Sequence, residues 1–321
     1  MIRQFSAAQL AVLDMSTLVT FSRLRRYPGF SVENLVAILR ADLAGWLADD
    51  GGYCLVMVDD ADKPVALACL HLLRWDAEHF AMPMFRLQLF SSANAGARQV
   101  EALVRRVLDG FGCQQGDHVS VEIDIDDYSG LNALLEIGFR IFDLRRTYCT
   151  NRMRQDIDFV RMRTRVRPYR DADHHAVMAL VGQVRFPSRF SRDPSISPDL
   201  AAGMYEKWFG RLLAAHGSSA NAVVYERQGE VVACGAIGEK DYQYAGVDLR
   251  LRTGSLYAGR PDAVGAYTPV LYQLIVDALE SHGLVDTTAS MNNVTVCRVL
   301  EGFRSYKSAA ASYSLSWRVD N

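Results

Sequence analysis

The stretch GSLYAGRPDAVGAYTPVLYQLIVDALESHGLVDTTASMNNVTVCRVLEGF, residues 254–303, carries the strongest fold signal in this chain. It predicts a strand at Ser255–Ala258, a loop of small residues at Gly259–Thr268 and a helix at Pro269–Ser281. Apolar residues recur at helical spacing on one face of this helix: Leu271, Leu274, Ile275, Ala278 and Leu279. We therefore expect the helix to pack on a core beside the strand that precedes it.

The rest of the stretch continues with a strand near Val285, the pair Asn292-Asn293, a short helix and Gly302-Phe303. A strand that leads through a glycine-containing turn into a helix presents free backbone N–H groups, and the helix N-terminus adds positive potential. Together these groups can hold a pyrophosphate. An ordinary strand–loop–helix connection has the same pattern, so both interpretations stay open at this point.

Length and composition predict a protein of two domains. The chain has 321 residues, of which 50% are hydrophobic and 22% charged, so it can bury two cores of ordinary size. Its net charge of −2 gives no global field that would attract nucleic acid. The Arg-rich run Arg161–Arg170 is local, and a solvated face or a linker explains it more simply than RNA binding. We expect no nucleic-acid partner.

The cysteines and the N-terminal residues bear on metal content and location. Six cysteines are widely scattered and none forms a Cys-x-x-Cys pair, so the sequence suggests neither a metal site nor a disulfide framework. Residues 1–12 lack the basic region and apolar core of a signal peptide, and no apolar run reaches membrane-spanning length. These features predict a cytoplasmic protein with no metal and no membrane partner.

Alternation and helical spacing predict an α/β (α+β) order of elements in both halves. For the first half we expect helices across 5–50, strands at 53–58, 64–73, 84–90, 119–125 and 141–150, and helices at 94–111 and 131–137. For the second half we expect helices at 171–184 and 198–213, a hairpin of strands 222–225 and 231–237 through Gln228-Gly229, and a closing strand at 312–319.

The two halves also share a motif. Leu134–Phe139 (LLEIGF) matches Val299–Phe303 (VLEGF) with one residue missing, and each follows a strand and a short helix. A period of roughly 160 residues is far too long for a solenoid and indicates a duplicated domain. We place the boundary in the polar, Arg-rich segment Asn151–Arg165, between domains at 1–155 and 160–321.

Two further segments give the pattern a family resemblance. The first is Leu73–Pro83 (LRWDAEHFAMP), and the second is Ser188–Pro194 (SRFSRDP) followed by Met204–Trp208 (MYEKW). With the strand–loop–helix stretch and the two Gly-Phe ends, they resemble the GNAT family of acyl-coenzyme A N-acyltransferases, in tandem over the whole chain. The closer resemblance is to enzymes of the dTDP-fucosamine acetyltransferase type, which N-acylate nucleotide-linked amino sugars in lipopolysaccharide O-antigen biosynthesis.

The resemblance implies two tandem GNAT-like domains, each a mixed, mostly antiparallel sheet flanked by helices. The N-terminal domain would be a degenerate partner that shapes the substrate cleft, and the C-terminal domain would bind acyl-CoA as cosubstrate between splayed strands. It implies a small-molecule acceptor, a dTDP-linked amino sugar, and allows a homodimer. The implied CoA-binding residues are Leu256, Tyr257, Ala258, Gly259, Val264, Gly265, Ala266, Tyr267, Thr268 and Asn293.

The sequence departs from the family pattern in three places. The family's loop has the form Arg/Gln-x-x-Gly-x-Gly/Ala, whereas this chain offers Arg260-x-x-Ala263-x-Gly265, or Ala263–Thr268 with no leading Arg or Gln. Many GNAT enzymes carry a Tyr in the short helix after the Asn, but Val294–Glu301 has none. In the first half, Ser91–Gly96 has a single glycine. A remodelled site suggests an acyl group longer than acetyl, or hydroxylated; otherwise the second domain is inactive.

The reaction implied is direct attack of a sugar amine on a thioester, which needs alignment, a proton acceptor and oxyanion stabilisation. Backbone N–H groups from Tyr257 to Gly259 suit the oxyanion, although a bulge at Gly259 explains that glycine equally well. The groups that could serve as base are Asp248, Glu239, Asp241, Asp193 and His216, besides a water chain to a distant carboxylate. The catalytic candidates carried forward are Tyr257 and Glu239.

The candidate substrate residues come from the second specific segment. Arg189 suits a phosphate, or fixes its loop by a salt bridge. Phe190 and Trp208 suit stacking on a base, or pack in the core, and Asp193 either contacts substrate or caps a turn. Two other functions stay open: a GNAT enzyme acting on another small amine, and a non-catalytic binding module.

Overall fold

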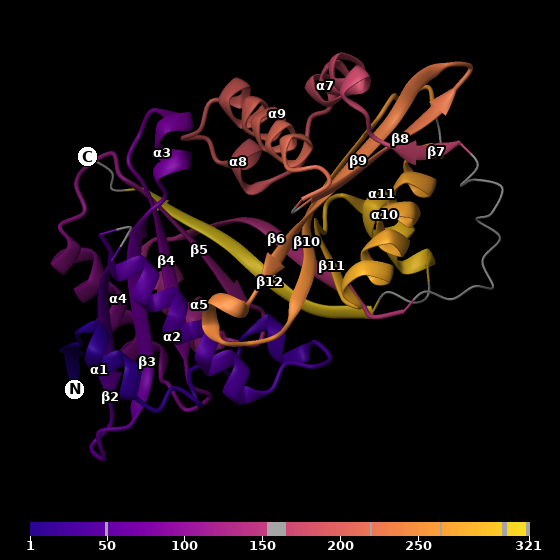
Figure 1. Ribbon diagram of the computed structural model, residues 1–321. Coiled ribbons are helices and arrows are strands. Elements are labelled where there is room, and N and C mark those ends of the chain that lie inside the picture. The colour runs from indigo at the N-terminus through magenta and orange to yellow at the C-terminus, as the bar shows by residue number, and fades with distance from the viewer. Residues whose placement is uncertain (49–50, 153–164, 219, 264, 304–306, 319–321) are drawn as a thin grey trace. The chain divides into compact units, whose positions relative to one another are not determined.

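The computed structural model describes residues 1–48, 51–152, 165–218, 220–263, 265–303 and 307–318, which form two compact units (Figure 1). Unit 1 contains Met1–Arg145, Tyr242–Asp248 and Ala310–Asn321, and unit 2 contains Arg146–Asp241 and Leu249–Ala309. Strand β6 (Arg140–Thr150) therefore begins in unit 1 and ends in unit 2, whereas β12 (Lys307–Arg318) begins in unit 2 and ends in unit 1. Of the predicted boundary segment, Asn151–Arg165, residues 153–164 lie outside the described residues.

Unit 1 is built on a mixed sheet. Its strands lie in the order β1 (Ile2–Gln4), β2 (Tyr53–Val58), β3 (Pro64–Leu72), β4 (Met84–Ser91), β5 (His118–Asp124) and then β12. Neighbours are antiparallel except β4 and β5, which run parallel. The last strand of the chain thus pairs with β5, with Ser314 opposite Glu122.

Helices cover both faces of this sheet. Helix α4 (Ala97–Phe111) and α5 (Tyr128–Ile137) share one apolar core with alternate residues of β2, β3, β4 and β5. Helix α2 (Val32–Ala48) lies on the other face, where Trp46 stacks on His71 with ring centroids 5.1 Å apart. The remaining helices of this unit are α1 (Ala7–Val12), η1 (Arg23–Arg26), α3 (Arg74–Phe80) and η3 (Gln243–Ala245). The expected helix across 5–50 is wrong for 13–22 and 27–31, which are turns and irregular chain.

Unit 2 repeats the arrangement. Its strands lie in the order β11 (Val285–Ser290), β10 (Arg250–Gly259), β9 (Glu230–Asp241), β8 (Ala220–Arg227) and β7 (Val166–Pro168). All neighbours are antiparallel except β10 and β11, which run parallel. The predicted hairpin turn between β8 and β9 is confirmed, and its two residues, Gln228 and Gly229, both have positive φ (54° and 83°). Two positive φ angles in a two-residue turn match the right-handed twist of the flanking strands.

The sheet of unit 2 is the middle of three layers. Helices α10 (Tyr267–His282) and α11 (Val294–Gly302) pack on one face, and α7 (His174–Gln183) and α9 (Pro198–Ala214) pack on the other (Figure 1). Helix η2 (Asp171–Asp173) precedes α7, and the four-residue α8 (Arg189–Arg192) precedes α9. Four of the five predicted apolar positions of α10 are fully buried: Leu271, Leu274, Ile275 and Ala278.

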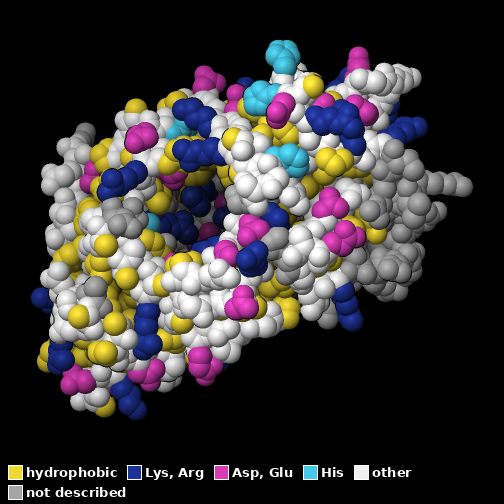
Figure 2. Space-filling model, viewed as in Figure 1, with side chains coloured by type: hydrophobic (Ala, Val, Ile, Leu, Met, Phe, Trp, Pro, Cys, Tyr) yellow, Lys and Arg dark blue, Asp and Glu magenta, His cyan; other side chains and the backbone are white. Residues whose placement is uncertain are grey.

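The described end of the Arg-rich run is neutralised locally. Arg167 donates to both carboxylate oxygens of Asp173 at 2.7 and 2.8 Å, and to Glu226 at 2.5 Å. On the face in Figure 2, Lys/Arg and Asp/Glu side chains accordingly lie side by side over β7 and α7. Within the described ranges, no helix combines the length and apolar character that crossing a membrane requires. The same residues contain no group of three or more His, Cys, Asp or Glu placed to hold a metal ion.

Candidate functional site

The parallel strands of unit 2 separate along their length. They pair at Arg252 and Val285, where the Arg252 amide donates to the Leu284 carbonyl at 3.1 Å. Beyond this point β10 runs on to Gly259 and β11 to Ser290, and no residues of these described segments pair with each other. Backbone pairing between these two strands therefore ends early in unit 2, as the family resemblance implies, and the segment where it has ended is called the opening.

A β-bulge lies where the strands begin to separate. The register between β10 and β9 shifts between Thr253 and Leu256, and Gly254 there has φ +70°. This conformation needs a residue without Cβ. The interpretation of Gly259 as the bulge glycine is wrong, because Gly259 pairs in register with Ala233. On the α9 side, Trp208 covers the bulge: a Cβ built on Gly254 would lie 3.6 Å from its Cζ2.

The predicted CoA-binding residues of β10 alternate between the two faces. Leu256 and Ala258 belong to the core beneath α7 and α9, whereas Tyr257 packs beneath α10. Its ring fits there because Gly235 stands opposite on β9. A Cβ on Gly235 would lie 2.6 Å from Tyr257 Cδ1 and 2.7 Å from Val270 Cγ1, closer than real Cβ atoms approach.

Hydroxyl groups gather at the opening on the α10 face. The Ser255 hydroxyl on β10 contacts the Thr287 hydroxyl on β11 at 3.4 Å, and the Tyr257 hydroxyl lies close to both. The Tyr257 ring meets the Tyr267 ring edge to face, with centroids 5.4 Å apart. Both tyrosine hydroxyl oxygens are buried and neither has a hydrogen-bond partner among the described residues. Burial raises the pKa of both phenols, so both are protonated at neutral pH.

The loop after β10 leads directly into a long helix. Gly265 has φ +81° with open space where a Cβ would be, and Ala266 and Tyr267 begin α10. The register Arg260-x-x-Ala263-x-Gly265 lies between the end of the strand and the start of the helix; Val264 is outside the described residues. Thr268 is in the first turn of α10, and its amide donates to the Gly265 carbonyl at 3.3 Å.

Arg260 is already paired with carboxylates. Its guanidinium contacts Asp262 at 2.6 and 2.9 Å and Glu230 at 2.8 Å. These bonds raise the pKa of Arg260 and hold the pKa of Asp262 below its usual range. The loop therefore has free space beside the Gly265 backbone. Its one arginine, Arg260, has its positive charge balanced by the carboxylates of Asp262 and Glu230. Sequence spacing gave no sign of Glu230, which lies on the neighbouring strand.

Asn293 and Arg192 make side-chain hydrogen bonds at and just after the end of β11. Asn293 caps α11, since its Oδ1 accepts from the Val296 amide at 3.4 Å. Arg192 of α8 lies 3.5 Å from the Ser290 hydroxyl. With the Asn292 carboxamide oxygen turned toward it, the same guanidinium donates at 2.9 and 3.2 Å. Sequence analysis missed Arg192, although it is the second arginine of the specific segment Ser188–Pro194.

Of the four candidate substrate residues, Arg189 and Phe190 lie on α8, Asp193 follows it as the C-cap, and Trp208 lies on α9. The Arg189 Cζ is 4.4 Å from the centroid of the Phe190 ring, which is itself buried. Asp193 accepts from the amide and hydroxyl of Ser195 at 2.9 and 2.6 Å, so its turn role is confirmed. Of the four, Trp208 is the one that the structure brings against the bulge of β10.

The two catalytic candidates are not brought together. Glu239 on β9 faces Arg252 with Nη2 and Oε2 3.4 Å apart, where β10 and β11 are still paired. It is four positions along β9 from Gly235, the partner of Tyr257, a separation of about 13 Å. Among the other base candidates, Asp241 contacts Arg250 at 3.3 Å, Asp248 belongs to unit 1, and His216 Nδ1 accepts from the Ala222 amide at 3.1 Å.

In unit 1 the equivalent strands also stop pairing before they end, but charged side chains are paired there. Strands β4 and β5 pair from Met84 and His118 to Leu87 and Val121, and β4 runs on to Ser91 and β5 to Asp124. Arg86 of β4 and Glu122 of β5 form an ion pair at 3.5 Å. At the end of β4 the Ser91 hydroxyl donates to the buried Asp127, the residue that caps α5.

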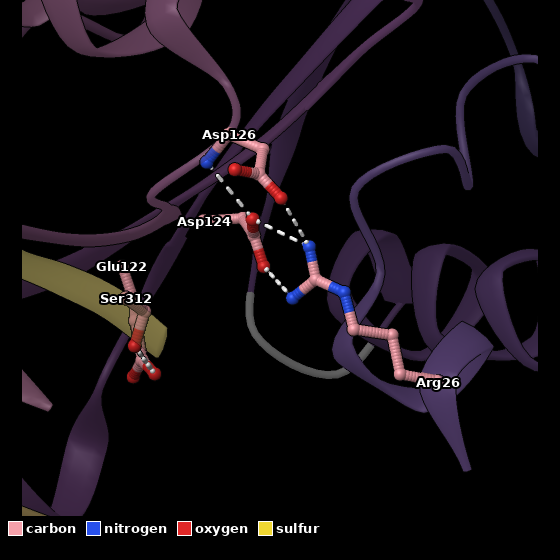
Figure 3. Close-up of polar contacts among 5 residues, drawn as sticks. All are labelled: Arg26, Glu122, Asp124, Asp126 and Ser312. Carbon is pink, nitrogen blue, oxygen red and sulfur yellow. Dashed lines mark hydrogen bonds and ion pairs between the residues drawn. The ribbon is translucent and has the colours of Figure 1, made fainter. Parts of the chain in front are cut away.

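Charged side chains also occupy the end of β5 (Figure 3). Arg26 donates to both oxygens of Asp124 at 2.7 and 3.0 Å and to Asp126 at 2.8 Å, while Ser312 donates to Glu122 at 2.7 Å. Burial opposes ionisation of Glu122, yet its surroundings hold the pKa of this carboxyl well below its usual range, through Arg145, Arg86, Arg23 and Ser312. At the start of α4, Gln99 Oε1 accepts from the Gly96 amide at 3.0 Å.

Comparison with known proteins identifies the fold. No protein-family model and no curated protein matches the sequence. A GCN5-related N-acetyltransferase from Sphaerobacter thermophilus superposes with a TM-score of 0.60 at 12% identity, covering 100% of this chain and 96% of that one. A fungal multi-domain GH3 β-N-acetylglucosaminidase with a GCN5-related glucosamine N-acetyltransferase region gives 0.58 at 11%, covering 99% of this chain and 38% of that one.

These likenesses show that the chain has the fold of the GNAT acetyltransferases over its whole length. The predicted fold class, two tandem GNAT-like domains with mixed sheets flanked by helices, is confirmed. The finer resemblance to enzymes of the dTDP-fucosamine acetyltransferase type stays a prediction.

Proposed function

We propose that unit 2 transfers an acyl group, acetyl or a longer or hydroxylated one, from acyl-CoA to the amine of a dTDP-linked amino-deoxy sugar. The observation that supports this most directly is the separation of β10 from β11 beyond Arg252 and Val285, with the bulge at Gly254. An unpaired strand edge offers main-chain donors and acceptors to an extended amide chain such as pantetheine.

The residues present fit this cosubstrate at two points. Along the opening, the edge of β10 from Ser255 to Gly259 would hold the pantetheine and thioester, and the buried Tyr257 and Tyr267 hydroxyls lack partners in the described structure. At the start of α10, the open backbone at Gly265 and the helix N-terminus would take the pyrophosphate. Arg260 would have to exchange Asp262 or Glu230 for phosphate, which favours a modest affinity for CoA.

The chemistry asked of the residues is alignment and charge stabilisation. Attack of the amine on the thioester carbonyl builds negative charge on its oxygen, and main-chain N–H groups at the bulge of β10 would stabilise that charge. We assign Glu239 the distant end of a water chain, because it lies about 13 Å along the strand from the Tyr257 level. Acyl-CoA supplies the activated acyl group, and the mechanism asks for no metal.

Aromatic and cationic groups on α8 and α9 support the choice of acceptor. Trp208 lies against the bulge, where a sugar or base could stack, and Arg189 and Arg192 carry the charge that a diphosphate needs. The fungal protein of similar fold contains a glucosamine N-acetyltransferase region, which also supports an amino-sugar acceptor. For unit 1 we infer a degenerate domain without acyl-CoA, because Arg86–Glu122 joins β4 to β5 and Ser91–Asp127 joins the end of β4 to the cap of α5.

Calorimetry with acetyl-CoA, longer acyl-CoAs and free CoA tests the first step. We expect one binding event per chain. A thiol-release assay with dTDP- and UDP-linked amino sugars, and with free amines as the comparison set, then tests the acceptor. Absence of heat with every CoA compound would replace the transferase by a non-catalytic binding module. Release with free amines alone would replace the nucleotide sugar by another small amine.

A further inference from the structure

A short arginine-containing segment is repeated in the two units. Ser22–Pro28 (SRLRRYP) in unit 1 and Ser188–Pro194 (SRFSRDP) in unit 2 share a serine, two arginines and a proline at matching places. The second segment follows the first by 166 residues. Each forms one helical turn, η1 in unit 1 and α8 in unit 2, and these turns end at Arg26 and Arg192. The duplication therefore extends to this pair of arginines.

The same offset relates the ends of β5 and β11. Asp127 caps α5, and Asn293, 166 residues later, caps α11. Three acidic residues of unit 1 thus correspond to neutral residues of unit 2: Glu122 to Thr288, Asp124 to Ser290 and Asp126 to Asn292. The segment that faces the arginine turn has therefore lost three carboxylates in unit 2, or gained them in unit 1.

In unit 1 these acidic residues hold the arginine of the repeated turn (Figure 3). Arg26 donates to both oxygens of Asp124 at 2.7 and 3.0 Å and to Asp126 at 2.8 Å. Arg23, three residues earlier, interacts electrostatically with Glu122. The arginines of this turn therefore have carboxylates of their own unit as counter-charges.

In unit 2 the partners of the equivalent arginine at these positions are uncharged. Arg192 lies 3.5 Å from the Ser290 hydroxyl, and it donates to the Asn292 carboxamide oxygen at 2.9 and 3.2 Å when that oxygen is turned toward it. The side chain is half-buried. A hydroxyl and an amide hold a guanidinium in place without neutralising it, so it keeps its attraction for an oxyanion.

Two carboxylates close to this arginine in the sequence or on the sheet have other positions. Asp193, directly after α8, accepts from the amide and hydroxyl of Ser195. Asp286 shares a face of β11 with Ser290 but lies four residues earlier, about 13 Å along the strand. It follows Val285, where the pairing with β10 ends. This face of β11 thus has a carboxylate at one end and a guanidinium at the other.

We propose that Arg192, with Arg189 one turn before it, binds the diphosphate of the acceptor at the place that three carboxylates fill in unit 1. The identity of this ligand rests on the proposed function of unit 2. Guanidinium groups suit phosphate oxygens because they can donate two parallel hydrogen bonds. The assignment also gives the acceptor a direction along β11, with its diphosphate at Ser290 and its amine toward Asp286.

The comparison of the two units supplies the test variant. Ser290→Asp combined with Asn292→Asp gives unit 2 both carboxylates that pair with Arg26 in unit 1. Ser290→Asn is the matched control, since Asn has the shape of Asp and residue 292 is already an amide. The double variant is expected to unfold at the wild-type temperature or above, because Arg192 gains two ion pairs. Arg192→Gln removes the cation instead and provides the test if the double variant does not fold.

Calorimetry with dTDP and with CoA gives the measurement. Wild type is expected to bind dTDP. The double variant should weaken dTDP binding about 100-fold and Arg192→Gln about 30-fold, whereas Ser290→Asn should change it less than about 3-fold. The Kd for CoA should change less than about 3-fold in every variant, because its proposed pyrophosphate site is at the start of α10.

Three results would overturn the assignment: no dTDP binding by wild type, equal dTDP affinity of the double variant and wild type, or equal weakening of CoA and dTDP by Arg192→Gln. A different result separates the assignment from the proposed function. Binding of dTDP that depends on Arg192, in a protein that neither binds CoA nor releases thiol, would support the diphosphate site and count against the transferase.

Discussion

The pair β4–β5 in unit 1 and the pair β10–β11 in unit 2 hold the same place in two copies of one fold, but their ends differ. In unit 1 an ion pair, Arg86–Glu122, joins the strands where their pairing ends, and a hydrogen bond, Ser91–Asp127, joins the end of β4 to the cap of α5. In unit 2 the contact across the opening is the 3.4 Å approach of two hydroxyls, Ser255 and Thr287.

Under the function proposed above, this difference is how a duplicated domain would lose a ligand site while keeping its fold. In unit 1 the charged side chains at this point are paired with one another, as Glu122 is with Arg86 and Arg145. Tyrosine hydroxyls without partners leave unit 2 with hydrogen-bonding capacity that a ligand can use.

The largest effect is expected at the loop before α10. Gly265→Asp should weaken CoA binding about 100-fold, roughly 2.8 kcal/mol, because it places a carboxylate where the pyrophosphate would lie. Gly265→Asn has nearly the same shape and tolerates the φ of +81°, so it controls for backbone strain. Calorimetry of both variants, beside Gly96→Asp at the start of α4, locates the site: sensitivity at Gly96 alone would move it to unit 1.

Next comes the charged bridge of unit 1. Glu122→Gln should lower the free energy of unfolding by about 2 kcal/mol at neutral pH, since it leaves Arg86 and Arg145 without their carboxylate. The pKa of Glu122 is held below its usual 4.5, so this stability is present above that pH and is lost as the pH falls further. Urea unfolding at pH 7 and pH 4 checks both points. A variant equal to wild type at pH 7 would mean that the bridge is not stabilising.

A smaller effect is expected at Gly235, the residue against which the Tyr257 ring packs. Gly235→Ala should cost about 1.5 kcal/mol of stability, because the added methyl group meets Tyr257 and Val270 at under 3 Å. Gly45→Ala in α2 is the matched control, since a methyl group there meets no atom within 4 Å and should be stabilising. Thermal unfolding of both should move in opposite directions; stabilisation by Gly235→Ala would show that the Tyr257 ring is not held tightly.

The smallest effect concerns Asp127, whose pKa burial raises. An acid with a raised folded-state pKa stabilises the fold below its unfolded value of 3.8, and that contribution is lost as the pH rises through the folded value. Asp127→Asn should therefore flatten the fall in stability above about pH 4, by roughly 1 kcal/mol. Its slope is opposite in sign to that of Glu122. A variant whose stability follows the wild-type pH curve would show that Asp127 does not titrate in this way.

Local patterns predicted the elements of the fold well. The apolar face of α10 and the hairpin at Gln228-Gly229 are set by spacing and by turn chemistry within a few residues. The helix predicted across 13–22 and 27–31 was wrong because apolar residues on a turn-rich chain resemble a helical face. A bulge was one of two interpretations of Gly259, but it lies at Gly254, since the sequence offers two glycines and only the register with β9 selects one.

The candidate site was harder to predict because its contacts join distant elements. Arg260 is paired with Glu230, which is 30 residues away, and Arg192 reaches Ser290, 98 residues further along. The edge-to-face contact of Tyr257 and Tyr267, and the space that Gly235 leaves for it, follow from the packing of α10 on the sheet. The roles of the predicted CoA and substrate residues stay predictions that the variants above can test.

The final strand, β12, has a consequence for how the polypeptide matures. Ser312 to Arg318 complete the edge of the first unit by pairing with Asp124 to His118, nearly two hundred positions earlier. The first unit cannot close its sheet during synthesis until those late residues emerge from the ribosome. A protein truncated before Ala310 would lack the last strand of unit 1, although most of that unit is synthesised first.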